Sequence, residues 1–248
     1  LLPGLGNVLQ HNANHDTADA ALFEIGRVFR DDDVQPAESW SLAIALTGRR
    51  FSPFYEGAER EAMNEFADIK GIIEEFADQF GMRGVSYERH DEAGEFFVES
   101  GSVKLGNKPV GTLGQFSPLL ARRHDLKHPV FFAEFDLGQA LQRRTTKRSF
   151  KALPAFPGTR RDIAMLVADD TTHDAVLQSV RKAKAKNLES VELFDVYRGE
   201  GVEAGQKSVA YAFHYRSAEG TLKDKQVDAV HGKVIERLRG DLSATIRA

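Results

Sequence analysis

The feature that most constrains the fold is a strict alternation of side chains between Ser208 and Arg216. Large apolar or aromatic residues alternate with small or polar ones, namely Val209, Tyr211, Phe213 and Tyr215 with Ser208, Ala210, Ala212 and His214. Because a β-strand points successive side chains to opposite faces, this repeat predicts a strand with one buried face. The chain should therefore contain a sheet that is covered on one side, with small residues on its open side.

The segments around this strand predict the order βαββαβ. Strands are expected at residues 161–167, 191–197, 208–216 and 242–246, and helices at residues 172–186 and after the capping-type pair Thr221 and Asp224. Gly240 is expected to end the second helix. This order predicts a ferredoxin-like sandwich, in which both helices cover one face of a four-stranded sheet and Ala164 lies on the open face.

The earlier part of the chain predicts a different α+β domain. Strands are expected at residues 22–29, 42–48, 85–90, 102–105, 109–115 and 130–137. Apolar residues spaced by three and four from Phe66 to Phe80 predict one long helix, which Gly81 ends. One long helix on a largely antiparallel sheet is the simplest architecture.

A basic segment with prolines separates the two parts. Seven Lys or Arg residues and no acid lie between residues 142 and 161, and Pro154 and Pro157 disfavour regular structure. We therefore expect domains at residues 1–145 and 157–248, joined by a linker at 146–156. The net charge of −4 hides this basic run, which could face phosphates.

Composition excludes several kinds of site. The absence of Cys removes disulfides and thiolate metal sites, and it suits a cytoplasmic protein. No apolar run is long enough to cross a membrane. The pairs His11/His15 and His124/His128 lack a third ligand, so no metal site is predicted. The chain opens without Met, and we expect it to be a fragment of a longer polypeptide.

The open sheet face is the candidate binding surface. Small side chains there leave room for a flat ligand, Tyr197 is a candidate platform for an unpaired RNA base, and Ser208 could read base edges. Basic residues near the strand ends are candidate phosphate partners, namely Arg160, Arg161, Arg198 and Lys207. Since exposed aromatic residues are common on soluble proteins, composition leaves a purely structural module open as well.

Four segments resemble, in order and spacing, the ferredoxin-fold anticodon-binding domain of the bacterial phenylalanyl-tRNA synthetase β subunit. They are RRDIA at 160–164, LFDVYRG at 193–199, GQKSVA at 205–210 and TL at 221–222. Residues 1–5, 22–29 and 68–71 are similar to the region just before that domain, so the resemblance spans nearly the whole chain. It implies that Ala164, Tyr197 and Ser208 line the anticodon pocket, with Tyr197 as the stacking residue.

The resemblance also implies what the first domain does. In that family this region has a class II synthetase-like fold that has lost catalysis, and a separate α subunit of an (αβ)₂ assembly carries the active sites. We therefore expect no catalytic residue, metal or cofactor in this chain, with ATP and magnesium bound only in the complete synthetase. The expected partners are tRNA(Phe) and the α subunit, and neither DNA nor a membrane.

Two sequence features bear on this expectation. No Gly-rich strand-helix motif ending in Arg follows Phe131, and Arg27 has no partner motif, so Arg27 is expected to be structural. The family's Gly-Glu-Leu-His-Pro stretch is altered here to GQFSP at residues 114–118, so any role of its acid and His is not carried over.

Two other functions stay open at this point. Acylphosphatases share the βαββαβ order, but they need an arginine-bearing, phosphate-cradling loop after the first strand. Here that loop, residues 168–172, carries Asp169 and Asp170, which would repel a phosphate. A small-ligand or protein-interaction module is the other alternative, since a fold does not dictate a function.

Overall fold

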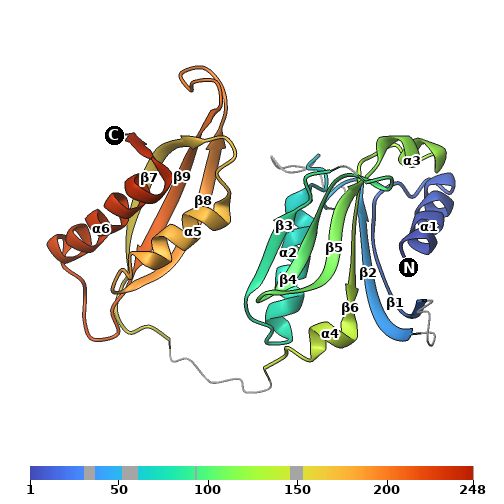
Figure 1. Cartoon of the computed structure of the whole chain (residues 1–248), viewed down its shortest axis with the longest axis horizontal. Helices are drawn as coiled ribbons and strands as arrows, with labels where there is room; N and C mark the ends of the chain where they lie inside the picture. The colour runs from blue at the N-terminus through green and yellow to red at the C-terminus, as the bar shows by residue number, and fades with distance from the viewer. Residues whose placement is uncertain (31–36, 52–60, 93, 146–152, 248) are drawn as a thin grey trace. The chain divides into compact units, whose positions relative to one another are not determined.

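The computed structural model describes residues 1–30, 37–51, 61–92, 94–145 and 153–247. The chain divides into two compact units, Leu1–Ser149 and Phe150–Ala248, which Figure 1 shows. Most of the predicted linker at 146–156 lies outside the described residues, and so do three of the seven basic residues, Lys147, Arg148 and Lys151. Each unit is described below by itself.

The first unit is built on a six-stranded sheet in the order β1-β2-β6-β5-β4-β3. All neighbouring strands pair antiparallel, which confirms the predicted antiparallel sheet. Strand β2 is buried from Ser41 to Thr47, so both sheet faces are covered at this position. The strands are β1 (Ala20–Arg30), β2 (Ala37–Thr47), β3 (Val85–Arg89), β4 (Phe97–Leu105), β5 (Lys108–Phe116) and β6 (Val130–Asp136).

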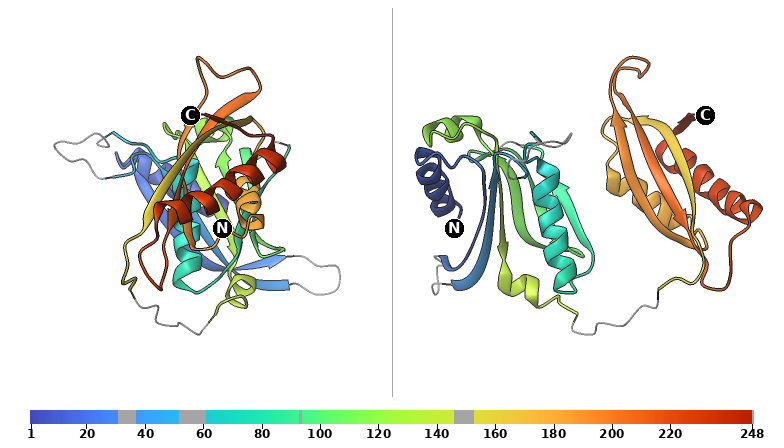
Figure 2. Two further views of the ribbon diagram at one scale, coloured as in Figure 1. Left: turned by 90° about the vertical axis from the view of Figure 1, so that its left-hand side faces the viewer. Right: turned by 180° about the vertical axis from the view of Figure 1, so that it is seen from behind.

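Helices cover both faces of this sheet, so the prediction of one long helix on one face was incomplete. Figures 1 and 2 show α1 (Leu2–Asn14) and α2 (Phe66–Gln79) on opposite sides of the strands. The short helices α3 (Pro118–Arg123) and α4 (Leu137–Leu141) pack with α1 and α2, respectively. Helix α1 was missed because its Pro and Gly residues lower helix propensity, whereas burial of Leu5 and Leu9 against the sheet stabilises it.

The second unit is the predicted ferredoxin-like sandwich. Its antiparallel sheet has the order β10-β7-β9-β8, and both helices lie on one side of it in Figure 1. The elements are β7 (Thr159–Ala168), α5 (His173–Lys182), β8 (Leu188–Tyr197), β9 (Gln206–Tyr215), α6 (Asp224–Leu242) and β10 (Thr245–Arg247).

Two predicted helix ends and one predicted strand start in this unit were wrong. Helix α6 continues through Gly240 to Leu242, because Leu242 packs on the core, and the helix ends at Ser243 with φ of 51°. The last strand therefore begins at Thr245 and not at Leu242. Helix α5 ends at Lys182, four residues earlier than predicted, and Lys184 follows with a positive φ that a helix cannot hold.

The alternation in β9 builds the core of the second unit, as predicted. Tyr211, Phe213 and Tyr215 are buried under α5 and α6 together with apolar residues of β7. Each tyrosine hydroxyl forms a 2.9 Å hydrogen bond with a histidine Nδ1, Tyr211 with His173 and Tyr215 with His231. Burial raises the pKa of both tyrosines to about 12, so the hydroxyls stay protonated and bonded at neutral pH.

The buried His231 predicts a loss of stability in acid. Burial, and then the charge of Arg161, hold the pKa of His231 below its ordinary value of 6.5, while Asp228 acts in the opposite direction. The unfolded chain therefore takes up a proton as the pH falls below about 6.5, and the folded unit resists it. We expect the unfolding temperature of the second unit to fall from pH 8 to pH 5, and His231→Gln to flatten this dependence. An equal slope for wild type and variant in thermal scans would contradict this assignment.

Candidate nucleic-acid interface

The face of the second sheet opposite α5 and α6 brings three predicted residues together. Tyr197 on β8 pairs with Ser208 on β9, and one row further along, Ala210 pairs with Ala164 on β7. Neighbouring strands lie about 5 Å apart and rows on one face about 7 Å apart, so these side chains lie within the footprint of a nucleotide. The open-face positions deduced from the alternation are therefore adjacent in space.

Tyr197 stands out from this face in a fixed position. Tyr197 is 44% exposed, and its hydroxyl donates a 3.3 Å hydrogen bond to the backbone oxygen of Glu200. A Cβ atom at Gly199 would lie 2.6 Å from that hydroxyl oxygen, which real Cβ contacts essentially never show. Glycine at position 199 thus lets the ring lie over the turn that follows β8.

Arg160 and Arg161, although adjacent in sequence, point to opposite faces. Arg160 pairs with His214 on the open side, and its Nε donates to Asp162 at 2.7 Å. Arg161 faces α6 instead, where it donates to two carboxylates, Asp224 at 2.7 Å and Asp228 at 3.0 Å. The structure therefore does not bring Arg161 to the surface that holds Tyr197.

Arg198 and Lys207 lie together where β7 ends. The Nε of Arg198 donates to a carboxylate oxygen of Asp169, and the Nζ of Lys207 donates to the backbone oxygen of the same residue, both at 2.7 Å. Burial, and then the charge of Arg198, lower the pKa of Lys207. These two cations flank the row of Tyr197 at one end of the sheet, although Lys207, paired with the core residue Val167, leaves β9 on the helix-covered side. A phosphate there would compete with Asp169 for both cations.

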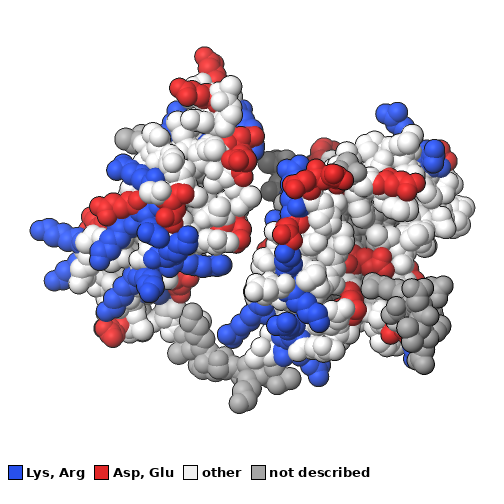
Figure 3. All heavy atoms as spheres, in the orientation of Figure 1, with Lys and Arg blue, Asp and Glu red and all other residues white. Residues whose placement is uncertain are grey.

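The two sides of the second unit carry different charges. Figure 3 shows Lys and Arg side chains gathered over α5 and α6, which hold Arg181, Lys182, Lys225, Lys233, Arg237 and Arg239. The open face exposes three carboxylates instead, those of Asp162, Glu192 and Asp195. A phosphate backbone is therefore disfavoured across the middle of the open face, whereas base N–H groups find acceptors there.

One aromatic residue of this face, Phe194, was missed by the sequence analysis. Strand β8 has an irregularity between Leu193 and Asp195, so Phe194 is an extra residue without a pairing partner on β9. Phe194 is 50% exposed, and the guanidinium of Arg160 lies 5.3 Å from its ring centre. The spacing of Leu193 and Val196 could have revealed it, because two residues three apart share a strand face only across a bulge.

The first unit contains a cavity of about 310 Å³ between α1, α3 and the sheet. Aromatic residues such as Phe97, Phe116 and Phe132 line it, and among the described residues its ionisable lining consists of His124 and Glu134. Arg27 lies outside it, on the edge strand β1, where it pairs with Glu38 at 2.6 Å and stacks on Trp40 at 5.2 Å.

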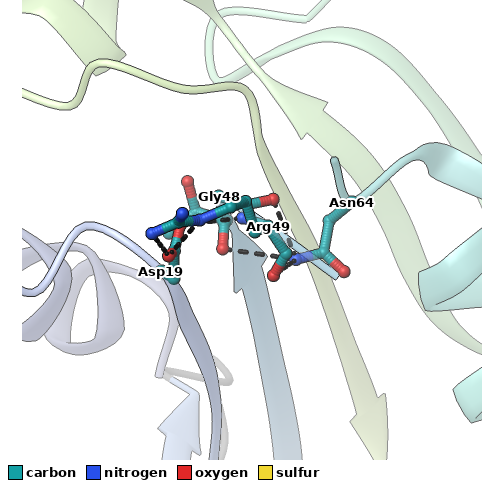
Figure 4. A network of polar contacts seen from close by, with 5 residues as sticks. Asp19, Gly48, Arg49 and Asn64 are labelled. Carbon is teal, nitrogen blue, oxygen red and sulfur yellow. Dashed lines mark hydrogen bonds and ion pairs between the residues drawn. The ribbon is translucent and has the colours of Figure 1, made fainter. Parts of the chain in front are cut away.

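A polar network fixes the chain after β2, and Figure 4 shows it. The backbone N–H and Nε of Arg49 each donate to Asp19 at 2.8 Å, which lowers the pKa of that carboxyl. The amide of Asn64 donates to the carbonyl oxygens of Gly48 and Arg49, both at 3.2 Å. Gly48 has φ of 75°, the left-handed region that favours glycine. Because its donors and acceptors satisfy each other, the network is structural.

No group of three or more His, Cys, Asp or Glu side chains in the part of the chain that the structure describes is arranged to hold a metal ion. Likewise, none of the described helices combines the length and the apolar character that crossing a membrane requires.

Comparisons with known proteins cover both units. Residues 1–137 match the family model for the phenylalanyl tRNA synthetase beta chain CLM domain, and residues 154–247 match the ferredoxin-fold anticodon binding domain. The phenylalanine–tRNA ligase beta subunits of Geobacter sulfurreducens and Syntrophotalea carbinolica are 35% and 33% identical to the chain, respectively. Each match covers 100% of this chain and 31% of the relative, so the chain spans about a third of their length.

A structural comparison adds a weaker likeness. The pyrrolysyl tRNA synthetase PylSc of Desulfitobacterium hafniense matches with a TM-score of 0.44 and 16% identity, over 57% of this chain and 48% of that one. This likeness assigns no residue. The two family models confirm the resemblance instead, since the first alone covers more than half of the chain. The chain belongs to the phenylalanyl-tRNA synthetase beta chain family and contains that family's ferredoxin-fold anticodon-binding domain.

Proposed function

We propose that this chain binds the anticodon region of tRNA(Phe) through the open face of its four-stranded sheet. The observation that carries the proposal is the adjacency of Tyr197, Ser208 and Ala164 on a face that α5 and α6 leave uncovered. An exposed aromatic ring beside small and hydroxyl side chains supports stacking of an unpaired base whose edge is read by hydrogen bonds. Asp195, in the row of Ala210, adds an acceptor for base N–H groups.

The phosphate contacts follow from the same geometry. Arg198 and Lys207 at the end of the sheet, and Arg160 on the open face, are the proposed partners of the RNA backbone. Arg161 was predicted with them, but its two carboxylate partners on α6 argue for a structural role, and the proposed surface does not include it.

Tyr197→Ala tests the proposed function directly. We expect the variant to bind a hairpin with the anticodon loop of tRNA(Phe) about 1–3 kcal/mol more weakly than wild type, because one base stack is lost. Affinity should be measured by fluorescence titration at a single fixed salt concentration, since phosphate contacts depend on salt.

Tyr87→Ala on β3 of the first unit is the control, because it makes the same Tyr→Ala change at another position. It removes a tyrosine distant in sequence from the proposed surface, and it should leave affinity for the hairpin unchanged. Equal affinities of wild type and Tyr197→Ala would sink the assignment of Tyr197.

The remaining proposals concern the complete enzyme. We propose that the first unit is noncatalytic and supports assembly with a catalytic α subunit in an (αβ)₂ synthetase, which binds ATP and magnesium elsewhere. The place of Arg27 supports this, because its guanidinium is engaged by Glu38 and Trp40 and does not line the cavity of that unit. We place the enzyme in the cytoplasm, where the absence of Cys suits the reducing conditions.

The acylphosphatase alternative finds no support in the geometry. The loop after β7 carries Asp169 and Asp170, and the Asp169 carboxylate already accepts a hydrogen bond from Arg198. The loop's own residues, 168–172, include two carboxylates and no arginine, so the loop by itself would not cradle a phosphate.

A further inference from the structure

Phe194 holds an aromatic ring on the open face at a second position. It is the extra residue of the β8 bulge, between Leu193, which packs on the core under α5 and α6, and Val196, which pairs with the core residue Val209. Phe194 is half exposed, although the apolar core lies on the other side of the same strand. The core therefore does not account for a phenylalanine at this position.

Arg160 forms the other half of this feature. It belongs to β7, and its guanidinium reaches across β9 to lie 5.3 Å from the Phe194 ring centre. The 2.7 Å hydrogen bond to Asp162 holds the guanidinium in place. Ala212 of β9, on the same face and between these two strands, is 0% exposed. A small residue at position 212 thus leaves room for the ring and the guanidinium to meet above the sheet.

We infer that Phe194 and Arg160 form a second base-binding position, so that the open face holds two unpaired bases of the RNA. A phenyl ring and a guanidinium plane both stack on nucleobases. Phe194 and Tyr197 are three residues apart on β8, which places them roughly 10 Å apart along the strand. Sheets of this shape stack two or three bases of one RNA strand side by side. The inference rests on the proposed function. It adds a second nucleobase to the ligand of this site, and it assigns Phe194 as the ring on which that base stacks.

The test uses the whole chain and a hairpin with the anticodon loop of tRNA(Phe). We expect Phe194→Ala to weaken binding about tenfold, and Phe194→Trp to bind within about twofold of wild type, because stacking needs a ring. Val196→Ala is the matched control, since it truncates an apolar residue of the same strand whose partner on β9 is the core residue Val209. It should leave the affinity unchanged. Melting temperatures of all variants check that the sheet stays folded.

Replacing one loop base at a time with an abasic nucleotide distinguishes stacking from a structural role. An abasic nucleotide should weaken binding of the wild-type chain at two loop positions. Phe194→Ala should be insensitive to the replacement at one of these positions, and Tyr197→Ala to the replacement at the other. Wild-type affinity of Phe194→Ala, or insensitivity of both variants to the same loop position, overturns the second position but leaves the proposed function standing. Failure of the wild-type chain to bind the hairpin overturns the proposed function itself.

Discussion

Phe213→Ala should destabilise the ferredoxin-like unit by about 3–5 kcal/mol, the usual cost of truncating a fully buried phenylalanine. Phe213 is 0% exposed at the centre of β9, where its ring lies edge-on to the buried His231. The free energy of unfolding of an ordinary domain is only about 5–15 kcal/mol, so this substitution removes a large part of it. Because β9 also carries Ser208, Ala210 and Ala212, we expect RNA binding to weaken together with the fold.

The two units allow this effect to be localised. The single tryptophan of the chain, Trp40, lies on β2 of the first unit, so its fluorescence reports on that unit during urea unfolding. We expect the Trp40 transition of Phe213→Ala to match wild type, while hydrogen exchange accelerates between residues 159 and 247. Phe194→Ala, on the exposed side of the same sheet, should change stability little. Similar destabilisation by both truncations would contradict the assignment of β9 as the core strand.

Gly111→Ala should destabilise the first unit by about 3 kcal/mol, at the upper end of the cost of overpacking. Gly111 pairs with Phe135 where β5 meets β6, inside the six-stranded sheet. A Cβ atom there would overlap the backbone oxygen of Glu134 and come within 2.9 Å of the Phe135 Cα atom. Because both of these atoms belong to the backbone, β5 and β6 would have to separate. The unfolding transition of Trp40 should therefore move to a lower urea concentration.

Gly71→Ala is the matched control for this variant. Gly71 lies within α2 of the same unit, and a Cβ atom built on it meets nothing within 4 Å. Alanine in a helix interior is favoured over glycine, so Gly71→Ala should stabilise the unit by up to about 1 kcal/mol. A destabilisation by Gly71→Ala as large as that by Gly111→Ala would show that the close approach of β5 and β6 is not the cause.

The sequence by itself predicted the ferredoxin-like fold and most of the residues of the candidate site. The period of two in β9 assigned Tyr211 and Phe213 to the core and Ser208 to the open face, because a strand has only two faces. The order of elements then predicted the four-stranded sheet, and the structure supplied the register that pairs Tyr197 with Ser208. The local sequence pattern is sufficient to predict the face that a side chain occupies where the strand or helix keeps its regular geometry.

The tertiary structure alone decided which of these residues meet. It added α1 to the first unit, since burial of Leu5 and Leu9 outweighs poor helix propensity. It turned Arg161 toward the carboxylates of α6, and it placed Phe194 on the open face through a bulge. Pairing partners and bulges depend on contacts between segments distant in sequence, so the second aromatic position of the site emerges only once β7, β8 and β9 lie side by side.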